Sequence, residues 1–130
     1  MPHPRYMKGY KNDAGVDIVL REDVCLKAKS MTVIDLGCTA NIPEGEAGFL
    51  LARTSAAKKG ILIASCPVDA DYSGSISAIV YNTNDYDIIY KEGGSFCQLV
   101  VFKIDYDAIP AEVRKEGRRT DGKFGSTGLC

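Results

Sequence analysis

Short apolar runs alternate along the chain with clusters of Gly, Pro, Asn and Asp, the residues that end strands and form turns. Within several runs the apolar residues recur with a period of two, as in Ile76, Ala78 and Val80. Repeated short strands of this kind predict an all-β sandwich, jelly roll or closed barrel. The predicted strands cover residues 16–20, 24–27, 31–36, 47–52, 61–65, 75–82, 86–90 and 96–104.

The segment 53–60 departs from this pattern and predicts a helix of about one to two turns. Thr54 or Ser55 is a suitable N-cap, two alanines favour the helix, and Gly60 fits the C′ position. The free N–H groups at its start, the two hydroxyls and Arg53 would together form an anion site. The alternative is a capped surface helix without a ligand.

Acidic residues gather in the segment 67–74, between two apolar runs. If this segment is extended, one of Asp69 and Asp71 could line a pocket while the other faces water. The alternative is a solvated hairpin turn, because Asp and Gly are common turn residues. Asp17 is a further candidate, because an aspartate within a strand is disfavoured.

The segment 117–130 is polar and rich in glycine. Its two arginines, its lysine and its hydroxyls would suit a polyphosphate, and Phe124 could stack on a base. The alternative is a solvated chain end. A Walker-type nucleotidase is excluded because no G-x-x-x-x-G-K-[ST] segment occurs.

Composition narrows the chemistry further. The length of 130 residues predicts one domain, and the formal net charge of −1 argues against a nucleic-acid-coating protein. No apolar run reaches the roughly 18–20 residues of a membrane span. Five scattered cysteines without a C-x-x-C pair predict free thiols in a reducing compartment.

Histidine is nearly absent, since His3 is the one histidine in the sequence. A Ser-His-Asp triad, a Cys-His dyad and a histidine-rich zinc site are therefore disfavoured. Carboxylates would then perform the proton chemistry of any enzyme, and an oxygen-bound ion such as Mg²⁺ is the natural metal.

Five segments, in this order, resemble the five motifs of the trimeric dUTPase family. The first, Ala14-Gly15-Val16-Asp17-Ile18, is similar to A-G-Y/F-D-L, and residues 53–60 are similar to R-S-G-L-A-x-K-x-G. Residues 68–74 resemble V-I-D-x-D-Y-R-G, residues 93–99 resemble G-D-R-I-A-Q-L, and residues 119–128 resemble R-G-x-x-G-F-G-S-T-G. Together these segments span nearly the whole chain.

The sequence departs from the family pattern at several positions, none of which removes a group implied in catalysis. Thr54 stands where Ser is usual and Ser55 where Gly is usual, while Gly94-Ser95 stand in place of Asp-Arg. Cys66-Pro67 precede Val68, and Thr120 and Lys123 replace glycines. These changes bear on affinity and on main-chain contacts.

The resemblance implies a distorted jelly-roll or β-barrel of short strands with one short helix, assembled as a homotrimer with shared active sites. Residues 1–130 would form a single domain, with 117–130 as a flexible active-site tail from a neighbouring subunit. The implied reaction is hydrolysis of dUTP to dUMP and pyrophosphate with Mg²⁺. This reaction limits uracil incorporation into DNA and supplies dUMP for dTMP synthesis. We expect neither a nucleic-acid nor a membrane partner, and a location in the cytoplasm, or in the host-cell interior for a viral or phage enzyme.

The resemblance also assigns roles to individual residues. Asp69 would be the general base that holds the attacking water, with Gln98 and Arg119 as further catalytic groups. Asp17 would hold Mg²⁺ through water. The substrate-binding set would be Arg53, Thr54, Ser55, Val68, Asp69, Tyr72, Gly74, Ser77, Gln98, Arg119, Phe124, Gly125, Ser126 and Thr127.

Two alternatives remain open. A dCTP deaminase-related enzyme shares this fold family, although such chains are generally longer. A catalytically silent, dUTPase-like nucleotide-binding regulator is the alternative from a different class, and the presence of Asp17, Asp69, Gln98 and Arg119 argues against it. Release of pyrophosphate from each nucleotide would discriminate among the three.

Overall fold

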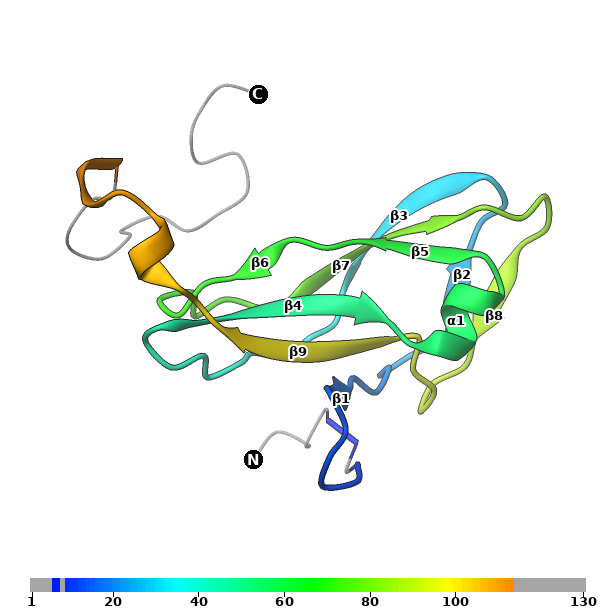
Figure 1. The fold of residues 1–130 in the computed structure, drawn as a ribbon. Helices are drawn as coiled ribbons and strands as arrows, with labels where there is room; N and C mark the ends of the chain where they lie inside the picture. Colours follow the sequence, from blue (N-terminus) through cyan, green and yellow to red (C-terminus); the bar gives the residue numbers. More distant parts are fainter. Residues whose placement is uncertain (1–5, 8, 114–130) are drawn as a thin grey trace.

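A computed structural model of the chain describes residues 6–7 and 9–113. Antiparallel strands form three small sheets (Figure 1). The first sheet has the order β1 (Val16–Asp17), β9 (Cys97–Lys103), β4 (Glu46–Ala52) and β6 (Pro67–Val68). The second has the order β3 (Ser30–Asp35), β7 (Ser77–Asn82) and β5 (Ile61–Ala64), and the third pairs β2 (Val24–Leu26) with β8 (Ile88–Tyr90).

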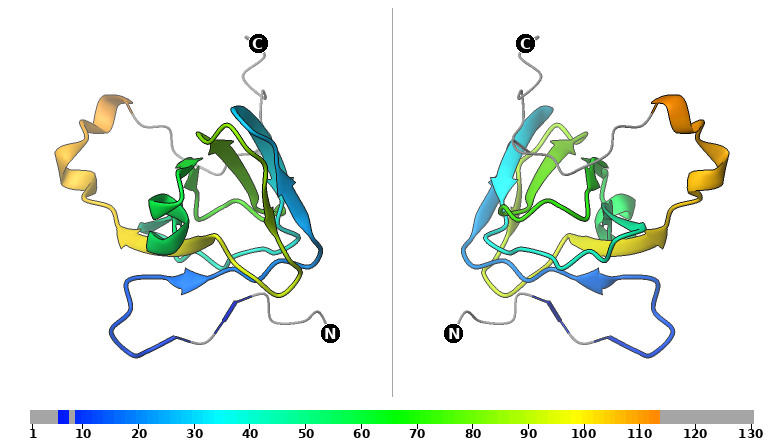
Figure 2. Two further views of the ribbon diagram at one scale, coloured as in Figure 1. Left: turned by 90° about the vertical axis from the view of Figure 1, so that its right-hand side faces the viewer. Right: turned by 90° about the vertical axis from the view of Figure 1, so that its left-hand side faces the viewer.

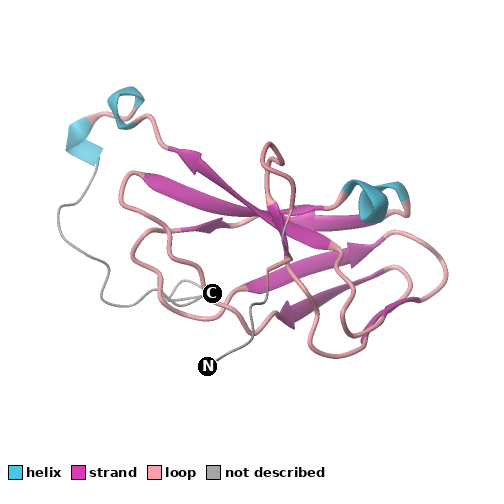
Figure 3. Ribbon diagram, turned by 90° about the horizontal axis from the view of Figure 1, so that it is seen from below, coloured by secondary structure: helices cyan, strands magenta, loops and turns pink. Residues whose placement is uncertain are grey.

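One short α-helix, α1 (Thr54–Lys58), connects β4 to β5 (Figure 1), and Figure 3 shows helices in cyan and strands in magenta. After β9 the chain forms two 3-10 helices, η1 (Tyr106–Ala108) and η2 (Ala111–Val113), which stand away from the sheets (Figure 2). The predicted all-β architecture with one short helix is therefore confirmed. Among the described residues, no helix is long and apolar enough to cross a membrane.

The core lies between the β4–β9 layer and the β3–β7–β5 layer (Figures 1 and 2). The alternation predicted around residues 76–80 is confirmed, because Ile76, Ala78 and Val80 are all buried. Phe96 is fully buried and its ring lies 5.4 Å from that of Tyr90, measured between centroids. Burial of such side chains, about 1.5–3 kcal/mol each, is the main force that holds the layers together.

The structure corrects several details of the predicted elements. The first predicted strand, 16–20, is regular over two residues, and Ile18 makes an isolated bridge to Tyr6. Pro67 and Val68 form an edge strand against β4 where a turn was expected, and η1 and η2 were not predicted. Other strand ends differ by up to two residues, which is the usual uncertainty of such boundaries.

The start of the helix also differs from the prediction. The N-cap is Arg53, whose side chain makes no capping hydrogen bond, and Thr54 and Ser55 are the first helical residues. Lys59 is the C-cap, and Gly60 follows it with a φ of +86°, as expected for a glycine at C′.

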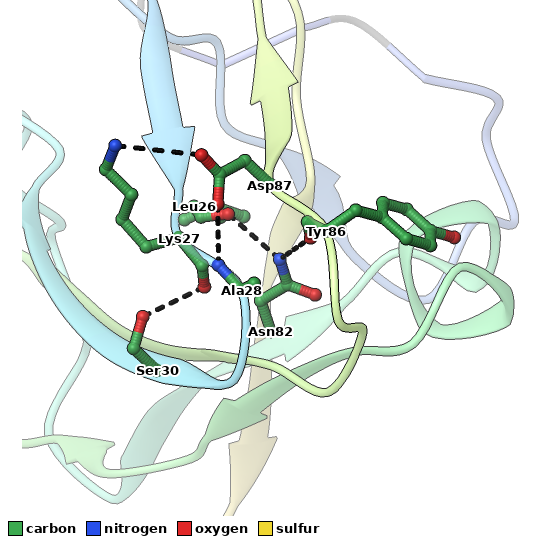
Figure 4. Close-up of polar contacts among 7 residues, drawn as sticks. All are labelled: Leu26, Lys27, Ala28, Ser30, Asn82, Tyr86 and Asp87. Atoms are coloured by element: carbon green, nitrogen blue, oxygen red, sulfur yellow. Dashed lines mark hydrogen bonds and ion pairs between the residues drawn. The ribbon is translucent and has the colours of Figure 1, made fainter.

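A buried amide ties three parts of the fold together. The Asn82 side chain, 1% exposed at the end of β7, donates hydrogen bonds to the carbonyl oxygens of Leu26 and Tyr86, both at 2.9 Å (Figure 4). Its oxygen accepts hydrogen bonds from the main-chain N–H (2.9 Å) and side-chain amide (3.0 Å) of Asn84. Asn82 therefore links β2 to the turn between β7 and β8.

Replacing Asn82 by Leu should lower the free energy of unfolding by about 2–4 kcal/mol, because buried carbonyl groups lose their donors. The exposed ion pair between Lys27 and Asp87 in the same view, at 3.6 Å, provides the control. Lys27→Ala should cost about 1 kcal/mol or less. Urea denaturation at one protomer concentration compares the two variants. Equal losses would show that the Asn82 amide has no special structural role.

Candidate active site

Three of the predicted site residues meet where β1, β9 and the start of α1 come together. Asp17 on β1 lies opposite Gln98 on β9, and Gln98 lies opposite Leu51 on β4. The Asp17 carboxylate forms an ion pair with the Arg53 guanidinium, with 3.2 Å between Oδ2 and Nε. We call this group of Asp17, Arg53 and Gln98 the polar cluster.

Hydrogen bonds to the main chain hold the polar cluster in place. Arg53 Nη1 donates to the carbonyl oxygen of Ser95 at 3.1 Å, and Gln98 Nε2 donates to the carbonyl oxygen of Ala52 at 3.3 Å. The Arg53 main-chain N–H donates a hydrogen bond to the carbonyl oxygen of Phe96 at 2.9 Å. The guanidinium is thus fixed at the start of α1, where the exposed hydroxyl residues Thr54 and Ser55 also lie.

Close packing against Gly15 sets the distance between β1 and β9. A Cβ atom at this position would lie 2.7 Å from Val100 Cγ2, 2.8 Å from Gln98 Oε1 and 2.8 Å from the Leu99 carbonyl oxygen. Because one of these neighbours is main chain, a side chain could be accommodated only if the strands moved apart. The absence of a side chain at Gly15 therefore brings Asp17 close to Gln98.

Buried groups that carry no charge at neutral pH lie behind the polar cluster. Burial raises the pKa of the Cys97 thiol to about 12, and the nearby Cys38 and Asp17 act in the same direction. Burial also raises the pKa of Tyr90, while the positive charge of Arg53 partly opposes this change. The thiol of Cys97 is therefore not a nucleophile here. Among the described residues, Cys25, Cys38, Cys66 and Cys97 are thiols that form no disulfide, as expected.

A second group of predicted residues lies in the turn between β6 and β7, which we call the β6–β7 turn (residues 69–76). Asp69 follows β6 directly, and Tyr72 closes the turn by donating its N–H to the Asp69 carbonyl oxygen at 3.1 Å. The chain thus turns at Ala70 and Asp71, so the expectation that Asp69 and Asp71 lie in an extended segment is wrong. Val68 points into the core, and Ser77 begins β7.

The Tyr72 ring folds back over the β6–β7 turn. Its hydroxyl donates a hydrogen bond to the Ser75 carbonyl oxygen at 2.7 Å. A Cβ atom at Gly74 would lie 2.6 Å from the same hydroxyl, so a side chain at this position would displace the ring. The Ser75 hydroxyl donates in turn to the carboxylate of Asp35, which also accepts the Gly37 N–H at 2.9 Å. These two bonds hold the pKa of Asp35 below its ordinary value.

The polar cluster and the β6–β7 turn lie at opposite ends of β4 (Figures 1 and 3). Val68 pairs with Gly48 near the start of β4. Asp69 is the next residue, so by the same antiparallel register it lies at the level of Ala47. Gln98 pairs with Leu51, which is four residues further along, or about 13 Å at the rise of a strand. One chain therefore holds Asp69 apart from the polar cluster.

The polar cluster could hold a hydrated cation but not a fully protein-bound one. Among the described residues, no three His, Cys, Asp or Glu side chains gather as metal ligands. Asp17 offers one carboxylate, of which Oδ2 faces Arg53. Mg²⁺ commonly keeps most of its water and uses one or two carboxylates together with substrate phosphates, so this donor set fits Mg²⁺ held through water.

Some predicted residues lie outside the described part of the chain: Arg119, Phe124, Gly125, Ser126 and Thr127. Conversely, three residues that hold the turn and the guanidinium were not predicted: Asp35, Ser75 and Ser95. Asp35 carried a usable signal, because it is an aspartate within a strand, the same feature that drew attention to Asp17.

Comparison with known proteins identifies the family of the chain. A model of the dUTPase family matches residues 3–128, and the chain therefore belongs to the dUTPase family. A deoxyuridine 5'-triphosphate nucleotidohydrolase of Paramecium bursaria Chlorella virus 1 is 34% identical over 125 residues, covering 95% of this chain and 89% of that protein. The protein of the same name from Saccharomyces cerevisiae is 32% identical over 124 residues, covering 93% of this chain and 84% of that protein.

A Pol polyprotein of Ovine maedi visna related virus is 32% identical over 118 residues, 89% of this chain, and the chain spans 11% of that polyprotein. Among solved structures, the native dUTPase of EIAV superimposes with a TM-score of 0.74 at 23% identity, covering 90% of this chain and 93% of that one. At this identity the structural likeness establishes the shared fold.

Replacing Gly15 by Ala should lower the free energy of unfolding by about 1–3 kcal/mol, because the added methyl group forces β1 and β9 apart. Gly9→Ala is the control, since its Cβ would meet the movable carboxylate of Asp13 at 2.5 Å. That variant should change stability by about 0.5 kcal/mol or less. Thermal and urea denaturation measure both, and a Gly15 variant as stable as the Gly9 variant would contradict the packing argument.

Proposed function

We propose that this protein hydrolyses dUTP to dUMP and pyrophosphate. The observation that carries the proposal is the polar cluster of Asp17, Arg53 and Gln98, formed by the residues that resemble the first, second and fourth family motifs. Family membership and the named nucleotidohydrolases among the relatives support it. A nucleotide triphosphate needs cationic and N–H donors for its phosphates, and the start of α1 supplies both kinds.

In the proposed mechanism, Asp69 holds a water and accepts its proton as the water attacks the α-phosphorus. The bond from the α-phosphorus to the oxygen that bridges it to the β-phosphorus breaks, and pyrophosphate leaves. An aspartate carboxylate is a weak base at neutral pH. Alignment of the water and stabilisation of negative charge therefore have to supply most of the rate.

The phosphate chain would bind at the end of β4 where α1 begins. Arg53, Thr54 and Ser55 would contact phosphate oxygens there. Gln98 would orient the phosphates beside the polar cluster. The pair between Arg53 and Asp17 is partly exposed, with side chains 37% and 26% accessible, so it is worth about 1 kcal/mol or less and can rearrange when a phosphate arrives. Arg119, Ser126 and Thr127 would close over the γ-phosphate, within a C-terminal tail spanning 117–130.

Asp17 would hold Mg²⁺ through water, beside the phosphates. When bound, the ion supplies neutralisation of the triphosphate charge. A phage phi11 dUTPase whose structure is described with a structural Mg(II) ion superimposes on this chain with a TM-score of 0.70. That structure supports the use of Mg²⁺ within the family.

Uracil and deoxyribose would bind along the β6–β7 turn and the start of β7. Main-chain groups of residues 74–77 would meet the base, and close packing there would exclude the methyl group of thymine. Tyr72 would occupy the space that a ribose 2′-hydroxyl requires, and Phe124 would stack on the base. Val68 would contribute through its main chain, because its side chain is buried.

The separation of the two groups supports an active site shared between subunits of a homotrimer. A second copy can bring its β6–β7 turn to the polar cluster of the first, which one chain does not achieve. The outer face of the β3–β7–β5 sheet offers a surface for this assembly. There Met31, Tyr81 and Leu62 form one row and Val33, Ile79 and Ala64 the next, with Met31, Val33 and Leu62 exposed by 63%, 64% and 54%.

Replacing Asp69 by Asn should abolish turnover and preserve nucleotide binding, because the amide keeps the shape but cannot accept the proton. Pyrophosphate release from dUTP, dCTP, dTTP and UTP with Mg²⁺ measures turnover, and calorimetry with the non-hydrolysable analogue dUpNHpp measures binding. Turnover near the wild-type rate would refute the role of Asp69 as base. Deamination of dCTP, or binding of dUTP without turnover, would favour the alternative functions instead.

Mixed trimers test whether the site is shared. Asp69→Asn and Arg53→Ala chains carrying different tags are co-expressed, and tandem affinity purification selects trimers that contain both. If Asp69 and Arg53 of one site come from different chains, each mixed trimer holds one intact site, which gives about one third of wild-type turnover. If both come from the same chain, mixed trimers should be as inactive as their parents.

A negative charge on the outer face of the β3–β7–β5 sheet should disrupt the proposed homotrimer. Val33→Asp is expected to yield monomers in size-exclusion chromatography with light scattering, because a carboxylate cannot be buried there without a partner. Ile89→Asp is the matched control, as Ile89 is an aliphatic strand residue of similar exposure, 59%, on the separate β2–β8 ribbon. A trimeric Val33→Asp protein would show that another surface forms the contact.

A further inference from the structure

Asp35 is a strand residue that none of the five motif segments contains, yet it contacts the β6–β7 turn directly. It ends β3 and lies opposite Ser77, the first residue of β7. A single oxygen of its carboxylate, Oδ1, accepts both the Ser75 hydroxyl and the Gly37 N–H. The carboxylate thereby joins the end of β3 to the turn that precedes β7.

Ser75 passes this contact on to Tyr72. The hydroxyl of Ser75 is held by Asp35, and the carbonyl oxygen of the same residue accepts the Tyr72 hydroxyl at 2.7 Å. Gly74, between them, leaves room for the phenol to lie over the main chain. Asp35, Ser75 and Tyr72 therefore form a continuous chain of hydrogen bonds from the sheet to the aromatic ring.

The main chain alone fixes one side of this arrangement. Leu36 N–H donates to the Ile76 carbonyl at 2.9 Å, and Ile76 N–H donates to the Cys38 carbonyl at 2.8 Å. The Ile76 N–H and the Ser75 carbonyl belong to one planar peptide group, so the bond to Cys38 also directs that carbonyl. The Asp35 contact holds the side chain of Ser75 and is therefore a second anchor for the segment that holds Tyr72.

We propose that Asp35 is a positioning residue for sugar selection, which fixes the Tyr72 ring through Ser75 so that the ring fills the space of a ribose 2′-hydroxyl. This inference rests on the proposed hydrolysis of dUTP and on the placement of deoxyribose against Tyr72. A displaced ring would admit the extra hydroxyl of UTP and contact deoxyribose less well. Loss of Asp35 should therefore narrow the preference between the two nucleotides.

The test compares kcat/KM for dUTP and for UTP in Asp35→Ala, Asp35→Asn and Ser75→Ala proteins. Because both observed bonds go to one oxygen, an asparagine carbonyl can accept both, and Asp35→Asn should retain the wild-type ratio within about twofold. Asp35→Ala and Ser75→Ala should each lower the ratio about three- to tenfold, the worth of one hydrogen bond. The double variant should fall no further than either single variant, since all act through one contact.

Asp87→Ala is the matched control, because Asp87 also accepts a main-chain N–H, that of Ala28 at 2.8 Å, and lies outside the turn (Figure 4). It should leave the ratio unchanged. Equal reductions for dUTP and UTP in Asp35→Ala or, should that protein not fold, in Ser75→Ala would overturn the inference. A wild-type protein that releases no pyrophosphate from dUTP would instead refute the proposed function, so the two failures are distinguishable.

Discussion

The pairing of β9 with two neighbours is the constraint on which the rest of the site depends. β9 pairs with β1 on one side and with β4 on the other, so Gln98 has Asp17 and Leu51 as its two partners. A shift by one residue would turn Gln98 into the core and expose the buried Cys97 and Leu99. Burial of the apolar residues thus fixes the register, and the register in turn brings the polar groups together.

Strand alternation made much of this architecture predictable from the sequence, whereas contacts between distant segments were not. The pattern around Ile76, Ala78 and Val80 gave the correct buried face, because burial of a sheet face imposes a period of two. The helix was predicted in the right place, but its N-cap was not. Arg53 directs its side chain to Asp17 and Ser95 instead of to the helix, and no local rule encodes those partners. Asp17 and the residues at the start of α1 were candidates from local rules, whereas Gln98 was found through the family resemblance.

Other errors have equally local causes. The turn expected at 67–74 rested on its Asp and Gly residues, yet Pro67 and Val68 form β6. Pro67 is tolerated there, although it lacks an N–H, because that strand is at an edge and pairs over two residues. Asp35 was overlooked although its position within a strand is unfavourable for an aspartate. Its compensation comes from Ser75, 40 residues away in sequence, and hydrogen bonds over such separations become visible only in the folded chain.

The rigidity of β4 explains why one chain keeps the β6–β7 turn apart from the polar cluster. The β6–β7 turn is attached at the start of that strand and the polar cluster at its end, and seven residues of paired backbone keep the two apart. Loop movement cannot close this distance without breaking the ladder to β9, which costs the hydrogen bonds and the core contacts together. Association of copies can bring the two ends together without that cost, because each subunit would keep its own sheet intact. On this argument the paired strand that stabilises the monomer supports the proposed active site shared between subunits.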